Sequence, residues 1–360
     1  MKAARYHALV AGASGVVGRR LAEVLAADPD WEVTGLSRRA QVGACAFKTI
    51  AVDLTDAADC KQKLGALANT THIFYAARYD HNSSGPEPID LNTNMLRHLV
   101  DAVEPAAANL QHIHMVQGSK YYGSTLPAYK TPALESDPRV ANNANFYYAQ
   151  EDYLFALQQV KPVKGRWTWS ASRPHAICDH STQYARALGM VIAVYANLCK
   201  ARGEPLHFPG TAGNYRALYQ CTEAALLARA IRWMSTDPAC ANQSFNITNG
   251  DYIRWENLWP LFADYFGMPL GDVKTVRLGE TMTTSGMAAA WKNITNKYHL
   301  KTISYDRLVV WPYGDFVFGP TFDIMSSTIK ARQFGFHECM DSGRMFIDLF
   351  DYYRREKVIP

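Results

Sequence analysis

Three glycines in the run Gly12-Ala-Ser-Gly15-Val-Val-Gly18 follow a short apolar segment and open a stretch with helical spacing. In that context a glycine pattern predicts a dinucleotide-binding turn. Gly12 would allow the tight turn, Gly15 would let the backbone approach a pyrophosphate, and Gly18 would permit close packing of the helix on the strand. The helix N-terminus would then face the phosphates. The turn residues predicted to contact the cofactor are Gly12, Ser14, Gly15, Val16, Val17 and Gly18.

The end of the second predicted strand, Ser37-Arg38-Arg39, indicates which dinucleotide binds. A carboxylate at this position accepts a hydrogen bond from a ribose 2′-OH, whereas an arginine pairs with a 2′-phosphate. The three residues include no carboxylate, and a guanidinium matches phosphate geometry. The sequence therefore favours NADPH over NADH, with solvated surface arginines as the alternative. Asp53, predicted with Leu54 to contact the cofactor, would hydrogen-bond the adenine or cap the next helix.

A lysine and two adjacent tyrosines are further candidates for chemistry. Lys120 follows the fifth predicted strand, at the sheet edge where ligands bind. Tyr147 and Tyr148 stand together in Asn145-Phe-Tyr147-Tyr148-Ala-Gln-Glu-Asp. Taken singly, Lys120 reads more simply as a solvated lysine and Tyr147 as a half-buried aromatic.

These motifs together resemble a known family. The glycine pattern is similar to that of the extended short-chain dehydrogenase/reductase superfamily, but its usual tyrosine four residues before a lysine is missing, since Glu151 and Asp152 stand there. Gly118-Ser-Lys120-Tyr-Tyr-Gly and Asn145-Phe-Tyr147-Tyr-x-x-Glu-Asp resemble the progesterone 5β-reductase/iridoid synthase-like (PRISE) enone reductases, a divergent branch. The resemblance covers nearly the whole chain, through segments such as Thr71-His-Ile-Phe-Tyr75, Asn92-x-x-Met95, Trp169-Ser-x-x-Arg173-Pro174 and Pro205-Leu-x-Phe208-Pro-Gly210.

The resemblance implies a 1,4-reduction in which hydride from NADPH adds to the β-carbon of a small hydrophobic enone, steroid-like, terpenoid or cyclic. Tyr147 would donate to the carbonyl oxygen, and Lys120 would lower the pKa of the tyrosine; Tyr148 takes that role if the register differs by one. Pro174 and Ala176 would contact the cofactor, although the family's Pro-Gly-Asn reads Pro174-His175-Ala176 here. The predicted substrate contacts are Tyr122, Leu126, Phe316, Phe318 and Phe322, with core packing as the alternative for the aromatic ones.

Two other functions stay open. The same scaffold could serve a carbonyl reductase or alcohol dehydrogenase, in which the tyrosine delivers a proton to an alkoxide. A protein of another class would bind NADP as a sensor without turnover. The retained pair of Tyr147 and Lys120 argues against a sensor, which needs neither side chain.

The elements that must position these residues alternate between short apolar runs and helical stretches, which indicates a parallel sheet with crossovers. The predicted strands are Ala8–Ala11, Glu32–Leu36, Ile50–Val52, His72–Tyr75, Ile113–Val116, Trp167–Ser172 and Ser244–Ile247. The predicted helices include the stretch after Gly18 and the segments Val191–Ala201, Thr222–Met234 and Trp255–Phe266.

We therefore expect an α/β protein with a Rossmann-type doubly wound parallel sheet and a smaller, mostly helical C-terminal domain. The NADPH-binding domain is predicted over residues 1–175, with a returning segment near 210–250. The substrate-binding domain is predicted mainly over residues 176–209 and 251–360.

Composition narrows the possible partners. The 360 residues are 48% hydrophobic and 19% charged, with a net charge of +4, which is too weak for a nucleic-acid-binding stripe. The start has no signal-peptide core and no apolar run approaches a membrane span, so we expect a cytoplasmic protein that avoids membranes. The seven cysteines show no CxxC spacing, and His112 and His114 have no further ligand nearby, so no metal is expected. A homodimer is one candidate for the oligomeric state.

Overall fold

The computed structural model describes residues 5–360 apart from residues 40–45, 80–86, 127–128, 164 and 181–185. One half of the molecule is built on a seven-stranded, all-parallel sheet with the order β10-β6-β5-β4-β1-β2-β3. The strand order reverses between β1 and β4, and the carboxyl ends of strands around such a switch point form the ligand site of doubly wound sheets. The strands are β1 (Tyr6–Ala11), β2 (Trp31–Ser37), β3 (Lys48–Ala51), β4 (His72–Tyr75), β5 (His112–Val116), β6 (Thr168–Arg173) and β10 (Gln243–Asn246).

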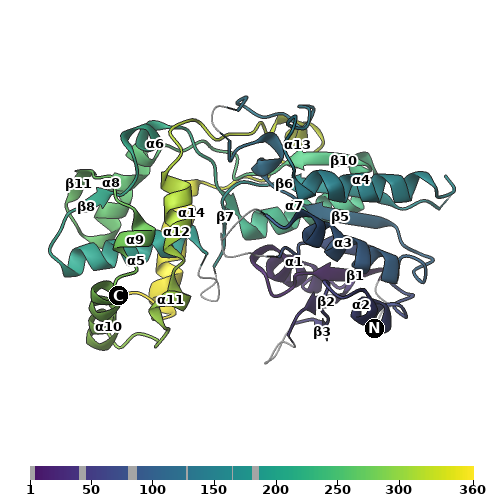
Figure 1. The fold of residues 1–360 in the computed structure, drawn as a ribbon, viewed down its shortest axis with the longest axis horizontal. Helices are drawn as coiled ribbons and strands as arrows, with labels where there is room; N and C mark the ends of the chain where they lie inside the picture. The colour runs from purple at the N-terminus through teal and green to yellow at the C-terminus, as the bar shows by residue number, and fades with distance from the viewer. Residues whose placement is uncertain (1–4, 40–45, 80–86, 127–128, 164, 181–185) are drawn as a thin grey trace.

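Helices cover both faces of this sheet (Figure 1). On one face α1 (Val16–Ala26) packs beside α7 (Ala224–Thr236). On the other face lie α2 (Ala57–Leu64), α3 (Ile89–Val103) and α4 (Phe146–Gln159). Because β1 alternates between the two cores, with Leu9 in one and Val10 in the other, both of its faces are buried from Ala8 to Ala11 and this part of the strand is apolar.

The other half is a mostly helical lobe with a core of its own (Figure 1). Its helices are α5 (Leu188–Ala201), α6 (Ala212–Arg216), α8 (Trp255–Phe266), α9 (Leu278–Thr281), α10 (Ser285–Lys297), α11 (Tyr305–Leu308), α12 (Trp311–Phe318) and α14 (Ser342–Arg355). The strands β8 (Leu206–Phe208) and β11 (Leu270–Val273) pair in parallel within this lobe. Between the halves, β7 (Ile177–Cys178) pairs in parallel with β9 (Thr222–Glu223). The chain returns to the sheet half a last time in α13 (Ile329–Gln333), which packs on β10.

The predicted fold class is confirmed, with small shifts in the elements. Each of the seven predicted strands is present, and α8 has the predicted bounds. The predicted helix at 222–234 begins two residues later, because Thr222–Glu223 forms β9 and the Glu223 side chain caps α7 by accepting from the N–H of Leu226. None of the helices in the described part of the chain has both the length and the apolar character needed to cross a bilayer.

A ladder of histidines and hydroxyls runs across the sheet. The ring nitrogens of His112 hydrogen-bond the hydroxyls of Thr168 and Ser170, and those of His114 hydrogen-bond the hydroxyls of Ser170 and Ser172. Burial lowers the pKa of both histidines, that of His114 to about 3, so they are neutral near pH 7. Over the described residues, no group of three His, Cys, Asp or Glu side chains is placed to hold a metal ion. The hydrogen bonds of the ladder satisfy the ring nitrogens of both histidines inside the sheet.

Candidate active site

The turn between β1 and α1 has no room for side chains at two of its glycines. Gly12 has a φ of +78°, and a Cβ at this position would lie 2.7 Å from the carbonyl oxygen of Ala76. A Cβ on Gly18 would lie 2.3 Å from the carbonyl oxygen of Gly12. Gly15 donates its N–H to that same oxygen at 2.7 Å. The backbone therefore turns tightly between the residues that follow β4 and the start of α1.

The start of α1 suits an anion. Gly15 is the N-cap, no side chain caps the helix, and its first turn has no acidic residue. A helix N-terminus of this kind attracts phosphate through its N–H groups and its dipole. This cradle, which a Cβ would fill, fits the pyrophosphate of a dinucleotide. The turn residues that line the adjoining cleft are Gly12, Ser14, Gly15 and Val16.

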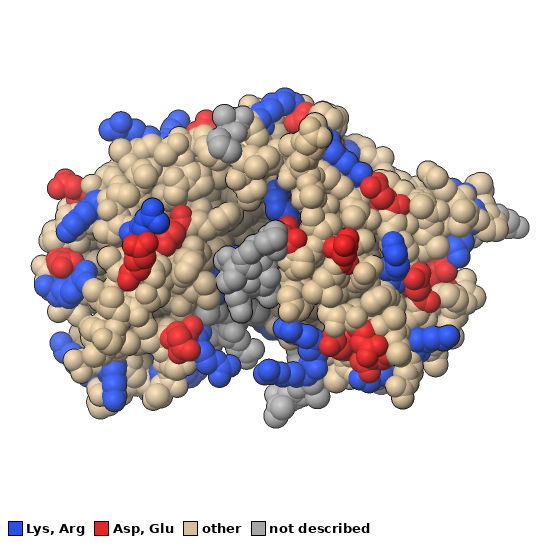
Figure 2. All heavy atoms as spheres, in the orientation of Figure 1, with Lys and Arg blue, Asp and Glu red and all other residues tan. Residues whose placement is uncertain are grey.

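The cleft has a volume of about 830 Å³ and lies between the carboxyl edge of the sheet and the C-terminal lobe. Figure 2 shows the hollow between the two halves, with basic side chains along its margin. The wall from the lobe is largely aromatic, with Tyr219, Tyr313, Phe316 and Phe322. The described residues that line the cleft include four basic side chains and one carboxylate, Asp53. The basic residues are Arg38, Arg78, Lys120 and Arg186. The cleft therefore combines an apolar wall with positive charge.

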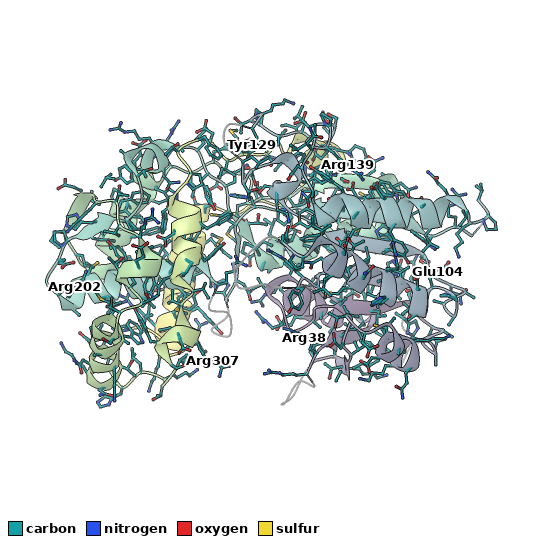
Figure 3. All side chains as sticks on the ribbon, viewed as in Figure 1. Arg38, Glu104, Tyr129, Arg139, Arg202 and Arg307 are labelled. Carbon is teal, nitrogen blue, oxygen red and sulfur yellow. The ribbon has the colours of Figure 1, made fainter. Side chains whose placement is uncertain are left out.

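The tip of β2 brings one arginine to the cleft. Arg38 lines it, and Figure 3 shows this side chain on the side of the sheet half that faces the lobe. Ser37 also lines the cleft, and its hydroxyl donates to the carbonyl oxygen of Arg39 at 2.5 Å. Arg39 itself is exposed and is not among the lining residues. A 2′-phosphate near this tip would meet Arg38 first.

Asp53 and Leu54, after β3, also line the cleft. The Asp53 carboxylate accepts hydrogen bonds from the N–H and the hydroxyl of Thr55, which lower its pKa, and nearby Arg38 lowers it further. The residue that caps α2 is Asp56. Of the two roles considered for Asp53, helix capping therefore belongs to another residue.

Tyr147 reaches the cleft from the first turn of α4. The helix begins there because the Asn145 side chain caps it, accepting from the N–H of Tyr147 at 3.0 Å. A Cβ added to Gly118 would lie 3.4 Å from the Tyr147 hydroxyl oxygen, so this hydroxyl lies beside the turn after β5. Tyr148 is buried, donates to the carbonyl oxygen of Tyr121 and accepts from the N–H of Val140. Of the two tyrosines, Tyr147 is the one whose side chain lines the cleft.

Lys120 lies in the short 3-10 helix η1 (Ser119–Tyr122). Its ammonium nitrogen is 4.1 Å from the ring centroid of Phe146 and 4.8 Å from that of Tyr147, and it forms an ion pair with Glu87. Burial lowers the pKa of Lys120, while Glu87 raises it.

The expected lowering of the Tyr147 pKa by Lys120 is not what the structure shows. Burial raises the pKa of this phenol to about 12, and the cation that counteracts the rise is Arg78. The ammonium lies over the ring faces rather than at the hydroxyl. Tyr147 is therefore protonated at neutral pH.

A second polar group lies in the same cleft. The Ser119 hydroxyl is 2.6 Å from Nδ1 of His175 and 2.9 Å from the hydroxyl of Ser124. Burial lowers the pKa of His175 to about 4, so the ring is neutral. The backbone N–H of His175 donates to the Thr222 hydroxyl, which donates to the carbonyl oxygen of His175. The bond between Ser119 and His175 ties the loop after β5 to the loop after β6, and the bonds with Thr222 tie the latter loop to β9.

Comparison with known protein families identifies the family of the chain. A model of the PRISE-like Rossmann-fold domain matches residues 49–360. The chain belongs to this family. The PRISE-like chain is 31% identical over 366 residues to a 3-oxo-Delta(4,5)-steroid 5-beta-reductase of Arabidopsis thaliana, which covers 98% of this chain and 93% of the relative. It is 32% identical over 370 residues to an (S)-8-oxocitronellyl enol synthase of Nepeta racemosa, with the same coverage. It is an NAD(P)H-dependent oxidoreductase.

Solved structures share the fold of the PRISE-like chain at low identity. A putative epimerase from Burkholderia cenocepacia superposes with a TM-score of 0.68 at 15% identity, over 98% of this chain and 99% of the other. A UDP-glucose 4-epimerase from Thermotoga maritima superposes with a TM-score of 0.68 at 14% identity, over 97% and 99% of the two chains. These likenesses concern the Rossmann fold alone.

Many of the residues predicted for the site of this PRISE-like protein line the cleft, and several do not. Pro174, Ala176, Phe316 and Phe322 line it together with the residues named above. In α1, the Val17 side chain points into the core between the helix and the sheet, and Gly18 packs against the backbone of Gly12. The predicted residues placed outside the lining are Val17, Gly18, Arg39, Tyr122, Leu126 and Phe318.

The predicted substrate contacts that do not line the cleft are bonded elsewhere, buried in the lobe or exposed to solvent. The Tyr122 hydroxyl donates to the side-chain oxygen of Asn246 at 2.7 Å, within a buried tyrosine cluster. Phe318 is 3% exposed in the core of the lobe, and Leu126 is 40% exposed. For Tyr122 and Phe318 the structure corresponds to the core-packing alternative.

Sequence reasoning missed several groups at the site. Arg78, Glu87, Tyr219 and Tyr313 were not anticipated. Arg78 follows β4 at the same sheet edge as Lys120 follows β5, so the rule that singled out Lys120 applies to it as well. Glu87 has no such signal, because it precedes a helix and meets its partners only in the folded chain.

Proposed function

We propose that this protein is an NADPH-dependent enone reductase that adds hydride to the β-carbon of a small hydrophobic α,β-unsaturated carbonyl compound. The observation that carries the proposal is that Tyr147 and Lys120 line the same cleft as the glycine cradle, opposite an aromatic wall. The names of the two curated relatives, a 3-oxo-steroid 5-beta-reductase and an 8-oxocitronellyl enol synthase, support a carbonyl-activated substrate.

Residues of the chain would supply the polar part of the reaction. NADPH, when bound, supplies the hydride. Tyr147, protonated at neutral pH, donates a hydrogen bond to the carbonyl oxygen as negative charge develops there. Lys120 adds positive potential from the face of the phenol ring. Phe316 and Phe322, on the opposite wall, exclude water from an apolar substrate and so strengthen both interactions.

Arg38 supports NADPH over NADH. Its guanidinium is positioned at the tip of β2, where a ribose phosphate would lie, and guanidinium groups match phosphate geometry. Arg39 lies next to it and is exposed. We assign the 2′-phosphate contact to Arg38, with Arg39 adding long-range charge.

We assign cofactor binding and substrate binding to different halves of the molecule. We assign cofactor binding to residues 1–175 together with the segment that returns through α7 and β10, and substrate binding mainly to residues 176–209 and 251–360. The structure supplies two amendments to these ranges. α6, at 212–216, packs on α8 of the lobe, and α13, at 329–333, packs on β10 of the sheet.

One assay separates the candidate reactions. NADPH oxidation is followed with a cyclohexenone, a 3-oxo-Δ4-steroid and a saturated ketone, and the products are identified by mass and retention. A saturated ketone from an enone supports the proposal. An allylic alcohol supports a carbonyl reductase, which the same Tyr147 hydroxyl could serve as proton donor. Tight NADPH binding without turnover of any of the three supports a sensor.

Two variants test the assigned groups. Tyr147→Phe removes the donor and should lower kcat by about 10²–10³, and Lys120→Ala should also lower turnover, both with NADPH affinity nearly unchanged. Tyr252→Phe is the matched control, since this tyrosine is 49% exposed and lies outside the cleft lining. Rates like wild type in both site variants would contradict the assignment.

A further inference from the structure

Glu87 connects two of the cations that line the cleft. Its Oε2 accepts from the ammonium of Lys120, and its Oε1 lies 3.2 Å from Nη2 of Arg78. The three side chains come from three places at the carboxyl edge of the sheet: after β4, before α3, and in η1. The Glu87 and Lys120 side chains are 19% and 23% exposed, so the pair is largely shielded from water.

Glu87 has no evident role in starting the helix that follows it. The N-cap of α3 is Pro88, without a side-chain capping bond, and an acidic residue already stands in the first turn as Asp90. Both carboxylate oxygens of Glu87 instead contact cations of the cleft. The placement therefore concerns the cleft and not the helix.

The ion pair determines where the positive charge of Lys120 lies. With Glu87 on one side and the rings of Phe146 and Tyr147 on the other, the ammonium is held on the aromatic faces at 4.1 and 4.8 Å from their centroids. A cation on an aromatic face is attracted by the ring quadrupole. A long, flexible lysine side chain would otherwise sample many positions along the sheet edge.

The carboxylate also favours the proton-bearing forms of both groups. Burial lowers the pKa of Lys120, and Glu87 opposes this by raising it, while Arg78 lowers it. For Tyr147, Glu87 adds to the rise caused by burial, and Arg78 counteracts it. The charged and titratable neighbours among the described residues are thus Arg78, Glu87, Lys120 and Tyr147. One carboxylate thus favours both the charged ammonium and the protonated phenol.

We infer that Glu87 is a positioning residue that holds the Lys120 ammonium on the ring face of Tyr147, so that its positive charge supports the phenol that donates to the carbonyl oxygen of the substrate. The formal charges of Arg78, Lys120 and Glu87 sum to +1, which favours negative charge developing nearby. The inference rests on the proposed reductase function for its catalytic part and on the geometry alone for the position of Lys120.

The first test measures Lys120 directly and needs no substrate. The whole protein is labelled with a trace of acetic anhydride between pH 7 and pH 10, and acetylation of each lysine is quantified by mass spectrometry. In Glu87→Gln the ammonium loses its partner, so the neutral amine fraction and the labelling rate of Lys120 should rise by about tenfold at pH 8, because an opposite charge within hydrogen-bond distance shifts a pKa by roughly one unit or more.

A matched control is available outside the cleft. Lys48 forms an exposed ion pair with Glu32, and its side chain is 74% exposed. Glu32→Gln should change the labelling of Lys48 by less than about twofold, because solvent screens an exposed pair. Glu87→Asp, which keeps the charge, should restore most of the protection of Lys120. Thermal melting of each variant is measured beside the labelling, so that a rate increase in an unfolded variant is recognised.

The second test is kinetic. In Glu87→Gln the alkaline limb of the kcat profile for enone reduction should move to lower pH, with the Kd for NADPH within twofold of wild type, and Glu87→Asp should move the limb back. Labelling of Lys120 that is unchanged in a folded Glu87→Gln protein overturns the inference. If wild type reduces no enone, the proposed function fails, whereas the labelling result still decides where Lys120 is held.

Discussion

Replacing Gly18 by alanine gives a sharp test of the glycine cradle. The new Cβ would lie 2.3 Å from the carbonyl oxygen and 2.6 Å from the carbonyl carbon of Gly12, and 3.1 Å from the amide nitrogen of Ala13. All three are backbone atoms, so no side chain can swing away. To reach an ordinary contact distance, the start of α1 must move by about 1 Å from the turn, and overpacking of this kind costs about 1–3 kcal/mol.

The same movement should weaken cofactor binding. The N–H groups at the start of α1 would shift by about the same distance from the pyrophosphate, and the loss of one or two well-aligned hydrogen bonds to a charged group lowers affinity by roughly 10- to 100-fold. We expect Gly18→Ala to melt several degrees lower than wild type and to bind NADPH correspondingly more weakly, measured by differential scanning calorimetry and by quenching of tryptophan fluorescence.

Gly286 provides the control. It is also near the start of a helix, α10, but a Cβ there would meet nothing closer than the Thr284 hydroxyl oxygen at 4.0 Å. Gly286→Ala should leave NADPH binding unchanged and stabilise the protein slightly, by up to about 1 kcal/mol, because alanine has the higher helix propensity. A Gly18→Ala protein with the melting temperature and NADPH affinity of wild type would refute the close-packing argument for the cradle.

Three further outcomes follow from the site and the sheet. Arg38→Ala combined with Arg39→Ala should weaken NADPH binding by roughly tenfold with little change for NADH, since a charge-assisted contact is lost; an unchanged preference in competition titrations removes the strand-tip argument. Phe316→Ala should raise KM for an apolar enone more than it lowers kcat. A larger effect on kcat than on KM would mean that Phe316 orients the substrate rather than adding to its binding. Stability should fall between pH 7 and pH 5, because buried His114 has a folded pKa of about 3, below its unfolded value, so the unfolded chain binds the proton first. His114 accounts for up to about 2 kcal/mol of the free energy of unfolding that is lost by pH 5. In His114→Gln, the decrease in the free energy of unfolding between pH 7 and pH 5, measured by urea unfolding, should be smaller by about that amount.

The parts of the fold that were predictable from sequence are those with a local cause. The bounds of β4, His72–Tyr75, match the prediction, because a strand buried on both faces reads as a nearly unbroken run of apolar and aromatic residues. The glycine turn was equally readable, since backbone geometry alone demands glycine at Gly12. Arg38 and Lys120 were predictable as cleft residues because each follows a parallel strand at the carboxyl edge of the sheet.

The misplaced side chains had causes of two kinds. Phe316 and Phe318 stand two residues apart on α12, and residues at that spacing point to different sides of a helix. Phe316 is 52% exposed while Phe318 is 3% exposed, so predicting both as cleft residues conflicted with helix geometry. Tyr122, by contrast, is buried through its bond to Asn246, more than a hundred residues away, and no local pattern in the sequence indicates that partner.

The positions of the proposed pair, Tyr147 and Lys120, explain why the usual tyrosine-lysine spacing is not needed. A lysine four residues after a tyrosine on one helix reaches the phenol because residues at that spacing share a helix face. Here the cation arrives from η1 and the phenol from α4, and Glu87, before α3, holds the cation against the ring. Since η1 and the starts of α3 and α4 meet at one sheet edge, the positions of the two groups depend on the sheet and not on a shared helix. The start of α4 is tied to η1 directly, because the Asn145 amide donates to the carbonyl oxygen of Lys120 at 3.3 Å. The same residue that caps α4 therefore keeps Tyr147 and Lys120 in register, a task that a shared helix performs where the two stand four residues apart.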